Sequence, residues 1–142
     1  MLASFGEMSE QGATRSATDI VDLAVPLRVD FAVSVRIMTA SLAADVGFTV
    51  DEIDDLRLGV SEVFTLLADH DLAAADERCH VTYVVSDGEI SVTMRRSGSR
   101  DPVELDPLAT SILASVVDEH QVDADGVTVV KRASEASGDS ND

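Results

Sequence analysis

The fold of this chain is decided by residues 49–70, which read Thr-Val-Asp-Glu-Ile-Asp-Asp-Leu-Arg-Leu-Gly-Val-Ser-Glu-Val-Phe-Thr-Leu-Leu-Ala-Asp-His. Thr49 followed three residues later by Glu52 is a capping box, in which each side chain satisfies a backbone donor of the first helical turn. Apolar residues then recur at three- and four-residue steps, which is the pattern of one buried helical face. They are Ile53, Leu56, Val60, Val63, Phe64 and Leu67. We therefore predict a helix that begins near Val50 and ends near residues 69–71.

One carboxylate of this helix lies beside the apolar stripe. A neighbouring row at four-residue spacing consists of Leu58, Glu62, Leu66 and His70. Residues at this spacing lie above one another on a helix, so Glu62 is placed at the edge of the apolar face. The role of Glu62 is the main functional question that the sequence raises.

Length and composition indicate one domain. The chain has 142 residues, 45% of them hydrophobic, which is enough for one core. No apolar run is long enough to cross a bilayer, and the first 18 residues carry Glu7 and Glu10 where a secretory signal needs positive charge. We expect a cytoplasmic protein. Cys79 is the single cysteine, so neither a disulfide nor a zinc knuckle is expected, and its thiol should be inert.

The charge balance is strongly acidic, with 27 Asp and Glu against 10 Lys and Arg and a net charge of −17. Such a surface repels nucleic-acid phosphate and anionic membranes, so we expect neither as a direct partner. It favours association with a basic protein. Solubility alone is the simpler explanation of the same charge.

The ends of the chain differ in composition from its middle. Residues 1–18 are rich in Ser, Gly and Ala without periodicity, and residues 133–142 are Ser, Gly and acid. Both segments are predicted to be disordered. Residues 19–132 are predicted to form the folded domain.

The first half of this domain is predicted to contain a strand and two helices. Residues 20–25 alternate loosely and are stopped by Pro26, which favours an edge strand. From a cap near Asp30, apolar residues repeat at helical spacing until Gly47 supplies a stop. The repeating residues are Phe31, Val35, Met38 and Leu42.

The second half is predicted to contain two hairpins around a helix. Residues 80–86 and 89–95 alternate on either side of Asp87-Gly88, a strong two-residue turn signal. Pairing outward from this turn places Val85 with Ile90, Tyr83 with Val92 and Val81 with Met94 on one apolar face. Asp106-Pro107 begins a helix that ends near Glu119, and residues 120–123 and 127–132 flank a second turn at Asp125-Gly126. The predicted fold is a two-layer α+β sandwich, with a mainly antiparallel sheet of about five strands and three helices on one face.

The order of elements and several segments resemble the bacterial anti-sigma factor and switch-protein serine kinase family, which has the histidine-kinase-like (GHKL) ATPase fold. The resemblance spans residues 20–132. Its best segment is residues 55–70, where the family has a helix carrying Glu, then Asn, then His at four-residue steps. Further matches are Val35-Arg36, the hairpin of residues 81–94, and the closing residues 125–132, where the family has a Gly-x-Thr element.

The resemblance implies ATP and Mg²⁺ as the cofactors of an active member, with Glu62 as the general base. The chain departs from the family at three of the elements that bind them. Leu66 replaces the metal-binding Asn and has no oxygen for a hard cation. Only Gly98 survives of the Asp-x-Gly-x-Gly element that contacts adenine, and the lid segment at residues 108–113 contains no glycine. Glu62, Gly98 and Thr128 are the remnants of a cofactor site, and no metal site is predicted.

The function predicted from the resemblance is an anti-sigma regulatory factor. It would sequester an alternative sigma factor and be controlled by an antagonist (anti-anti-sigma) protein, with impaired or absent ATP binding and no phosphoryl transfer. Arg36 is the candidate partner contact, since the first helix faces sigma factors in the family, and a homodimer is compatible with the family. Two alternatives stay open: an active ATP-dependent serine kinase of the antagonist, and an unrelated acidic α+β interaction domain.

Overall fold

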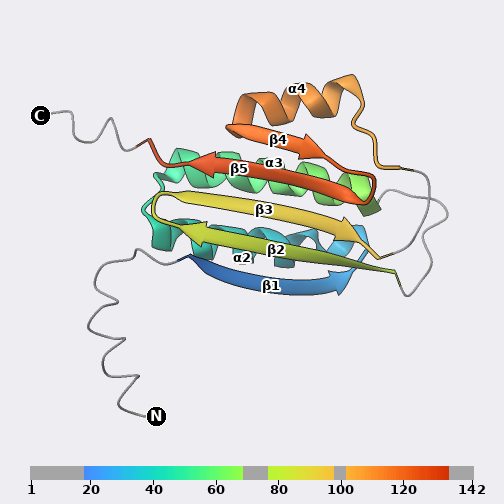
Figure 1. Ribbon diagram of the computed structural model, residues 1–142, viewed down its shortest axis with the longest axis horizontal. Helices are drawn as coiled ribbons and strands as arrows, with labels where there is room; N and C mark the ends of the chain where they lie inside the picture. Colours follow the sequence, from blue (N-terminus) through green and yellow to red (C-terminus); the bar gives the residue numbers. More distant parts are fainter. Residues whose placement is uncertain (1–17, 69–76, 98–101, 135–142) are drawn as a thin grey trace, which may run out of the picture.

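A five-stranded antiparallel sheet forms one layer of the computed structural model, and three helices form the other (Figure 1). The structure describes residues 18–68, 77–97 and 102–134. The strands are β1 (Asp19–Pro26), β2 (Arg78–Ser86), β3 (Glu89–Arg96), β4 (Glu119–Val122) and β5 (Gly126–Arg132). The helices are α2 (Ala32–Val46), α3 (Val50–Ala68) and α4 (Pro107–Val116), and a short 3-10 turn, η1 (Val29–Phe31), precedes α2. This arrangement confirms the predicted fold class.

The sheet has the order β1-β2-β3-β5-β4, so β1 is an edge strand as predicted. Its register at the first hairpin is also the predicted one: Val85 pairs with Ile90, Tyr83 with Val92 and Val81 with Met94. All six side chains are buried. Side chains alternate between the two faces of a strand, so Thr82, Thr93 and Thr128 share the opposite face, which none of the described helices covers (Figure 1).

α3 is built as its sequence predicts. The Thr49 backbone N–H donates to Glu52 Oε1 at 2.8 Å, and the Glu52 N–H donates to Thr49 Oγ1 at 3.1 Å, which is the capping box. The predicted apolar face is buried except at Ile53, which is partly buried against the core. The helix is described as far as Ala68, and His70 lies outside the described residues.

α2 joins the two layers through a small buried polar network. Thr39 and Tyr83 are both fully buried, and their hydroxyl oxygens lie 2.9 Å apart. Each hydroxyl also lies within hydrogen-bonding distance of the Val35 carbonyl, at 2.8 Å from Thr39 and 3.3 Å from Tyr83. A buried polar group is costly unless it is hydrogen-bonded, and here both hydroxyls are satisfied.

Two predicted helix ends are corrected by the structure. Asp30 does not cap α2: its N-cap is Phe31, with no side-chain bond, and Asp30 lies within η1 and pairs with Arg28 at 3.6 Å. α4 begins as predicted, with Asp106 accepting from the Ala109 N–H at 2.8 Å, but it ends at Val116. Glu119 belongs to β4 instead, because the chain turns extended at Val117 and joins the sheet through the Asp118 N–H, which donates to the Val130 carbonyl.

Candidate functional site

Glu62 is half-buried on α3, between the buried residues Val60 and Val63. It makes no hydrogen bond or ion pair with another described residue. A general base must lie within hydrogen-bond reach of the group that it deprotonates. Glu62 is accessible for this, but none of the described residues orients its carboxylate.

Leu66, one helical turn beyond Glu62, has an apolar side chain in an apolar environment. Leu66 is partly buried and packs against the hydrophobic core. Its alkyl side chain therefore contributes to packing and offers no oxygen to a metal. Among residues 18–68, 77–97 and 102–134, no group of three or more His, Cys, Asp or Glu is placed to hold a metal ion.

The segment that the resemblance assigns to a glycine-rich lid is helical. Residues 108–113 lie within α4, and this helix packs directly on α3 at Gly59. A Cβ atom added at Gly59 would lie 3.1 Å from Val117 Cγ1, 3.4 Å from Val116 Cγ2 and 3.6 Å from Leu113 Cδ2. The side chains of α4 and its C-terminal end thus fill the space above this part of α3.

The other two remnants of a cofactor site do not join Glu62. Gly98 lies outside the described residues. Thr128 points to the uncovered face of the sheet, where its hydroxyl lies 2.9 Å from that of Thr93. Because α3 covers the opposite face, the structure does not bring Thr128 and Glu62 together. The described residues therefore do not fit a nucleoside triphosphate with Mg²⁺.

Arg36 links the two long helices. Its Nη1 atom donates to Ser61 Oγ at 2.9 Å across the contact between α2 and α3. Among the described residues, Arg28, Arg57, Arg95, Lys131 and Arg132 form ion pairs with carboxylates. Arg36 has no such pair there, although the chain is rich in acid. Its guanidinium has five N–H donors and keeps donors for a further acceptor.

Exposed apolar side chains lie on α2, the helix of Arg36, and on the η1 turn that precedes it. Val29 of η1 and Val33 and Ile37 of α2 recur every four residues and are 54%, 50% and 64% exposed. We call these three residues the α2 stripe. Between Val29 and Val46 the only charged residues are Asp30, Arg36 and Asp45. The α2 stripe thus places three exposed apolar side chains on a segment with few charges, in a strongly acidic protein.

A concave region lies at the N-terminal end of α3. It has a volume of about 650 Å³ and lies between the α2–α3 junction, the β2–β3 turn and the end of β5. The charged residues that line it are Glu52, Asp87, Glu89 and Arg132. Hydrogen bonds to Glu119 and Glu89 raise the pKa of the Arg132 guanidinium, so this cation is already neutralised by neighbours.

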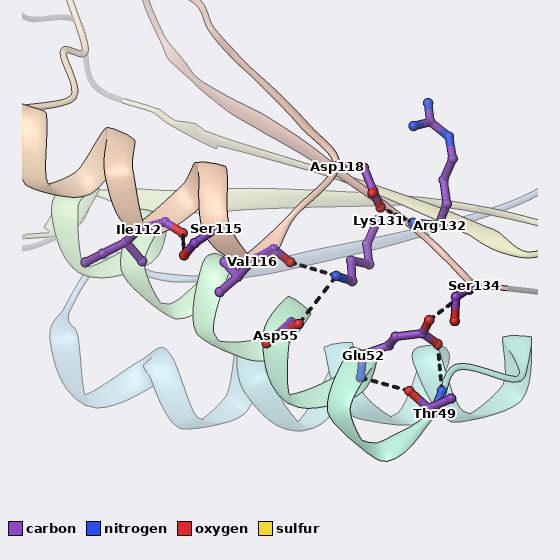
Figure 2. Close-up of polar contacts among 10 residues, drawn as sticks. All are labelled: Thr49, Glu52, Asp55, Ile112, Ser115, Val116, Asp118, Lys131, Arg132 and Ser134. Atoms are coloured by element: carbon purple, nitrogen blue, oxygen red, sulfur yellow. Dashed lines mark hydrogen bonds and ion pairs between the residues drawn. The ribbon is translucent and has the colours of Figure 1, made fainter. Parts of the chain in front are cut away.

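Glu52 is the best-bonded carboxylate of this region. Partial burial raises the pKa of Glu52, but hydrogen bonds from Ser134 and Thr49 outweigh it and hold the pKa below its ordinary value. The Ser134 N–H donates to Glu52 Oε2 at 2.8 Å (Figure 2). The carboxylate thus ties the start of α3 to the chain that leaves β5, and is occupied by intramolecular bonds.

Two residues of these sites were not singled out by sequence reasoning: Ser61 and Gly59. Ser61 carries no sequence signal of its own, because its partner Arg36 lies 25 residues away in the chain. Gly59 did carry one, since a glycine inside a strong helical pattern weakens the helix unless a neighbour packs close to its backbone.

No helix in the described part of the chain is long and apolar enough to span a membrane.

Comparison with known proteins gives a structural match only. No protein-family model matches the chain, and no curated protein matches it. A similar solved structure is that of the RsbU and RsbW domains of Rv1364c from Mycobacterium tuberculosis, with a TM-score of 0.61 and 17% sequence identity. The match covers 81% of this chain and 32% of the other, so this chain spans about a third of that length. The similarity shows the fold.

Proposed function

We propose that this protein is an anti-sigma regulatory factor that binds an alternative sigma factor through α2 and is controlled by an antagonist protein, without ATP turnover. The fold is shared with a structure described as RsbU and RsbW domains. The resemblance of residues 20–132 to the anti-sigma and switch-kinase family supplies the functional part of the proposal.

The observation that carries the proposal is the combination of Arg36 with the α2 stripe. Val33 and Ile37 are exposed three residues before and one residue after Arg36, whose half-buried guanidinium has no carboxylate partner among the described residues. Such a surface suits an apolar helix with one carboxylate, because the apolar contact supplies area and Arg36 supplies a charge-assisted hydrogen bond. The acidic remainder of the chain favours basic residues at the edges of the same partner.

Control by exchange of protein partners follows from the state of the nucleotide elements. Leu66 packs against the core in place of a metal ligand, and α4 packs on Gly59. In this proposal Glu62 has no bound phosphate to act on. We propose that the antagonist displaces the sigma factor by competing for the surface of α2.

The test is to isolate the protein with its partners from its native host, identify any sigma factor by mass spectrometry, and reconstitute the purified pair. We expect Ile37→Asp and Arg36→Ala each to weaken the pair at least about tenfold, the effect of losing a central contact. Leu108→Asp is the matched control, because Leu108 is 68% exposed on α4 and away from α2, and should leave the affinity unchanged.

Two other outcomes separate the alternatives. Micromolar binding of ATP with Mg²⁺ by calorimetry, together with phosphate transfer to a partner that is lost in Glu62→Ala, would establish the kinase. If neither a sigma factor nor a nucleotide binds, the remaining alternative is an acidic interaction domain with a different protein partner.

A further inference from the structure

Lys131 is the only lysine of the chain, and it lies at the meeting point of three elements. It follows the buried Val127 and Val129 on the helix-facing side of β5, and its side chain is only 12% exposed. Its Nζ atom donates to the Val116 carbonyl at the end of α4 at 2.9 Å and pairs with Asp55 of α3 at 3.5 Å (Figure 2). One ammonium group therefore connects β5, α3 and α4.

The end of α4 needs such a partner. The last carbonyls of a helix receive no hydrogen bond from an N–H of the same helix, and together they carry a partial negative charge. At this end the Leu113 carbonyl accepts from the Val117 N–H at 3.0 Å, and the Ile112 carbonyl accepts from Ser115 Oγ at 2.8 Å. Lys131 satisfies the Val116 carbonyl and adds a positive charge at the negative end of the helix.

The chain beyond α4 is also fixed on both sides of Lys131. The Asp118 N–H donates to the Val130 carbonyl at 2.8 Å. The Arg132 N–H donates to Asp118 Oδ2 at 2.7 Å, as Figure 2 shows. With the close packing on Gly59, α4 is held by an apolar contact along its length and by polar contacts at its end.

We propose that α4 is a fixed cover on α3, and that Lys131 locks it through Asp55 and the Val116 carbonyl. Residues 108–113, which the resemblance assigns to a lid, lie within α4, so the lock holds this segment on the core. The lock itself is independent of the partner. The lock has a regulatory consequence: no ligand binds beneath α4, and regulation occurs at the surface of α2. This consequence rests on the function proposed above.

The test is hydrogen exchange of the full chain, followed by mass spectrometry and resolved for peptides of α3 and α4. In the wild type we expect the α4 amides to exchange within about tenfold of those of α3, as in one cooperative unit. Lys131→Met keeps the apolar stem and removes the charge, and should speed α4 exchange by roughly 10- to 100-fold, the factor for a lost charge-assisted hydrogen bond. Asp55→Asn should produce a smaller change in the same peptides.

Arg57→Met is the matched control, because Arg57 pairs with Asp54 at the same 3.5 Å distance on the exposed side of α3. It removes the same charge without touching α4 and should leave α4 exchange unchanged. If Lys131→Met does not fold, Asp55→Asn against Arg57→Met decides the question.

Three results would overturn the lock: α4 exchange as fast as in the loops of the wild type, equal effects of Lys131→Met and Arg57→Met, or protection of α4 on adding ATP with Mg²⁺. None of these requires a sigma factor. Loss of the proposed function would leave the exchange result standing, and the two failures are therefore distinguishable.

Discussion

At the scale of single residues, close packing decides what this fold tolerates. Gly126 begins β5, where the strand crosses close to β3. A Cβ atom there would lie 2.0 Å from the Met94 carbonyl oxygen and 2.9 Å from Arg95 Cα. Both neighbours are backbone atoms of a central strand and cannot swing away. Glycine is therefore required here by proximity.

Gly126→Ala should accordingly destabilise the protein by more than about 2 kcal/mol, because β3 and β5 must separate to accommodate the methyl group. Urea unfolding followed by circular dichroism measures the change. Ser91→Ala, a half-buried position on the uncovered face of β3, is the control and should stay within about 0.5 kcal/mol of the wild type. Equal effects of the two substitutions would contradict the packing argument.

Two buried acids of β2 predict how stability depends on alkaline pH. Burial raises the pKa of the Cys79 thiol to about 12, and burial also raises the pKa of the Tyr83 hydroxyl to about 12. A raised folded-state pKa stabilises the fold below the ordinary pKa, and this stability is lost as pH rises towards the folded value. The free energy of unfolding should therefore fall from about pH 9 upward.

Cys79→Ala and Tyr83→Phe should each flatten this alkaline decline, in addition to any loss of stability at neutral pH. The thiol should also react slowly with iodoacetamide at pH about 8 until the chain is unfolded, because the thiolate is the reactive form. Rapid alkylation of the folded protein would show that Cys79 is not buried as described.

At the scale of elements, the sequence predicts well where its signals are local. The capping box of Thr49 and Glu52 and the Asp87-Gly88 turn each depend on neighbouring residues, and both appear in the structure with the predicted partners. The register of the first hairpin follows from its turn. These features fix α3 and the centre of the sheet.

The features that fail lack a decisive local signal. Asp30 has the residue type of a helix cap, but it pairs with Arg28 two residues away, and the N-cap of α2 is Phe31. The predicted apolar repeat of α2 faces the core only in part: Val35 is buried, and Phe31, Met38 and Leu42 are partly buried against the core. The fully buried residues of α2 also include Ala32, Thr39 and Ala43, which the spacing does not single out. The exposed α2 stripe could not be told from a core face by spacing alone. The packing of α4 on Gly59 likewise depends on a tertiary contact.

The contact between α3 and α4 gives a prediction at this scale. Gly59→Leu introduces a better helix former, so the intrinsic propensity of α3 improves. Its side chain must nevertheless displace Val117 or Leu113, which lie within 3.6 Å of the added Cβ. Overpacking of this kind typically costs about 1–3 kcal/mol.

Thermal unfolding of Gly59→Leu should therefore show a lower Tm than the wild type, and hydrogen exchange should localise the change to α4. Thr65→Leu is the control, since Thr65 is exposed on the same helix and also becomes a better helix former. A Tm for Gly59→Leu equal to or above that of Thr65→Leu would mean that α4 does not pack on α3 as described.

At the scale of the whole molecule, charge is the dominant property. A net charge of −17 on 142 residues makes self-repulsion a cost of the compact state. The described ion pairs are mostly exposed, and exposed pairs contribute little each. Repulsion among the excess carboxylates should therefore outweigh attraction in the response to salt.

We expect NaCl between about 10 and 300 mM to raise the free energy of unfolding, because the screening length falls across this range.

The charge-reversing pair Asp45→Lys and Glu104→Lys tests the cause. Both positions are exposed, and Asp45 lies in the last turn of α2, where a negative charge opposes the helix dipole. The double variant should be more stable than the wild type at low salt and should show a shallower dependence on NaCl. An unchanged slope would assign the salt effect to ion binding or to general solvent exclusion and would contradict control by net charge. A slope of opposite sign in the wild type would mean that the ion pairs, above all that of the partly buried Lys131, outweigh the repulsion among the excess carboxylates.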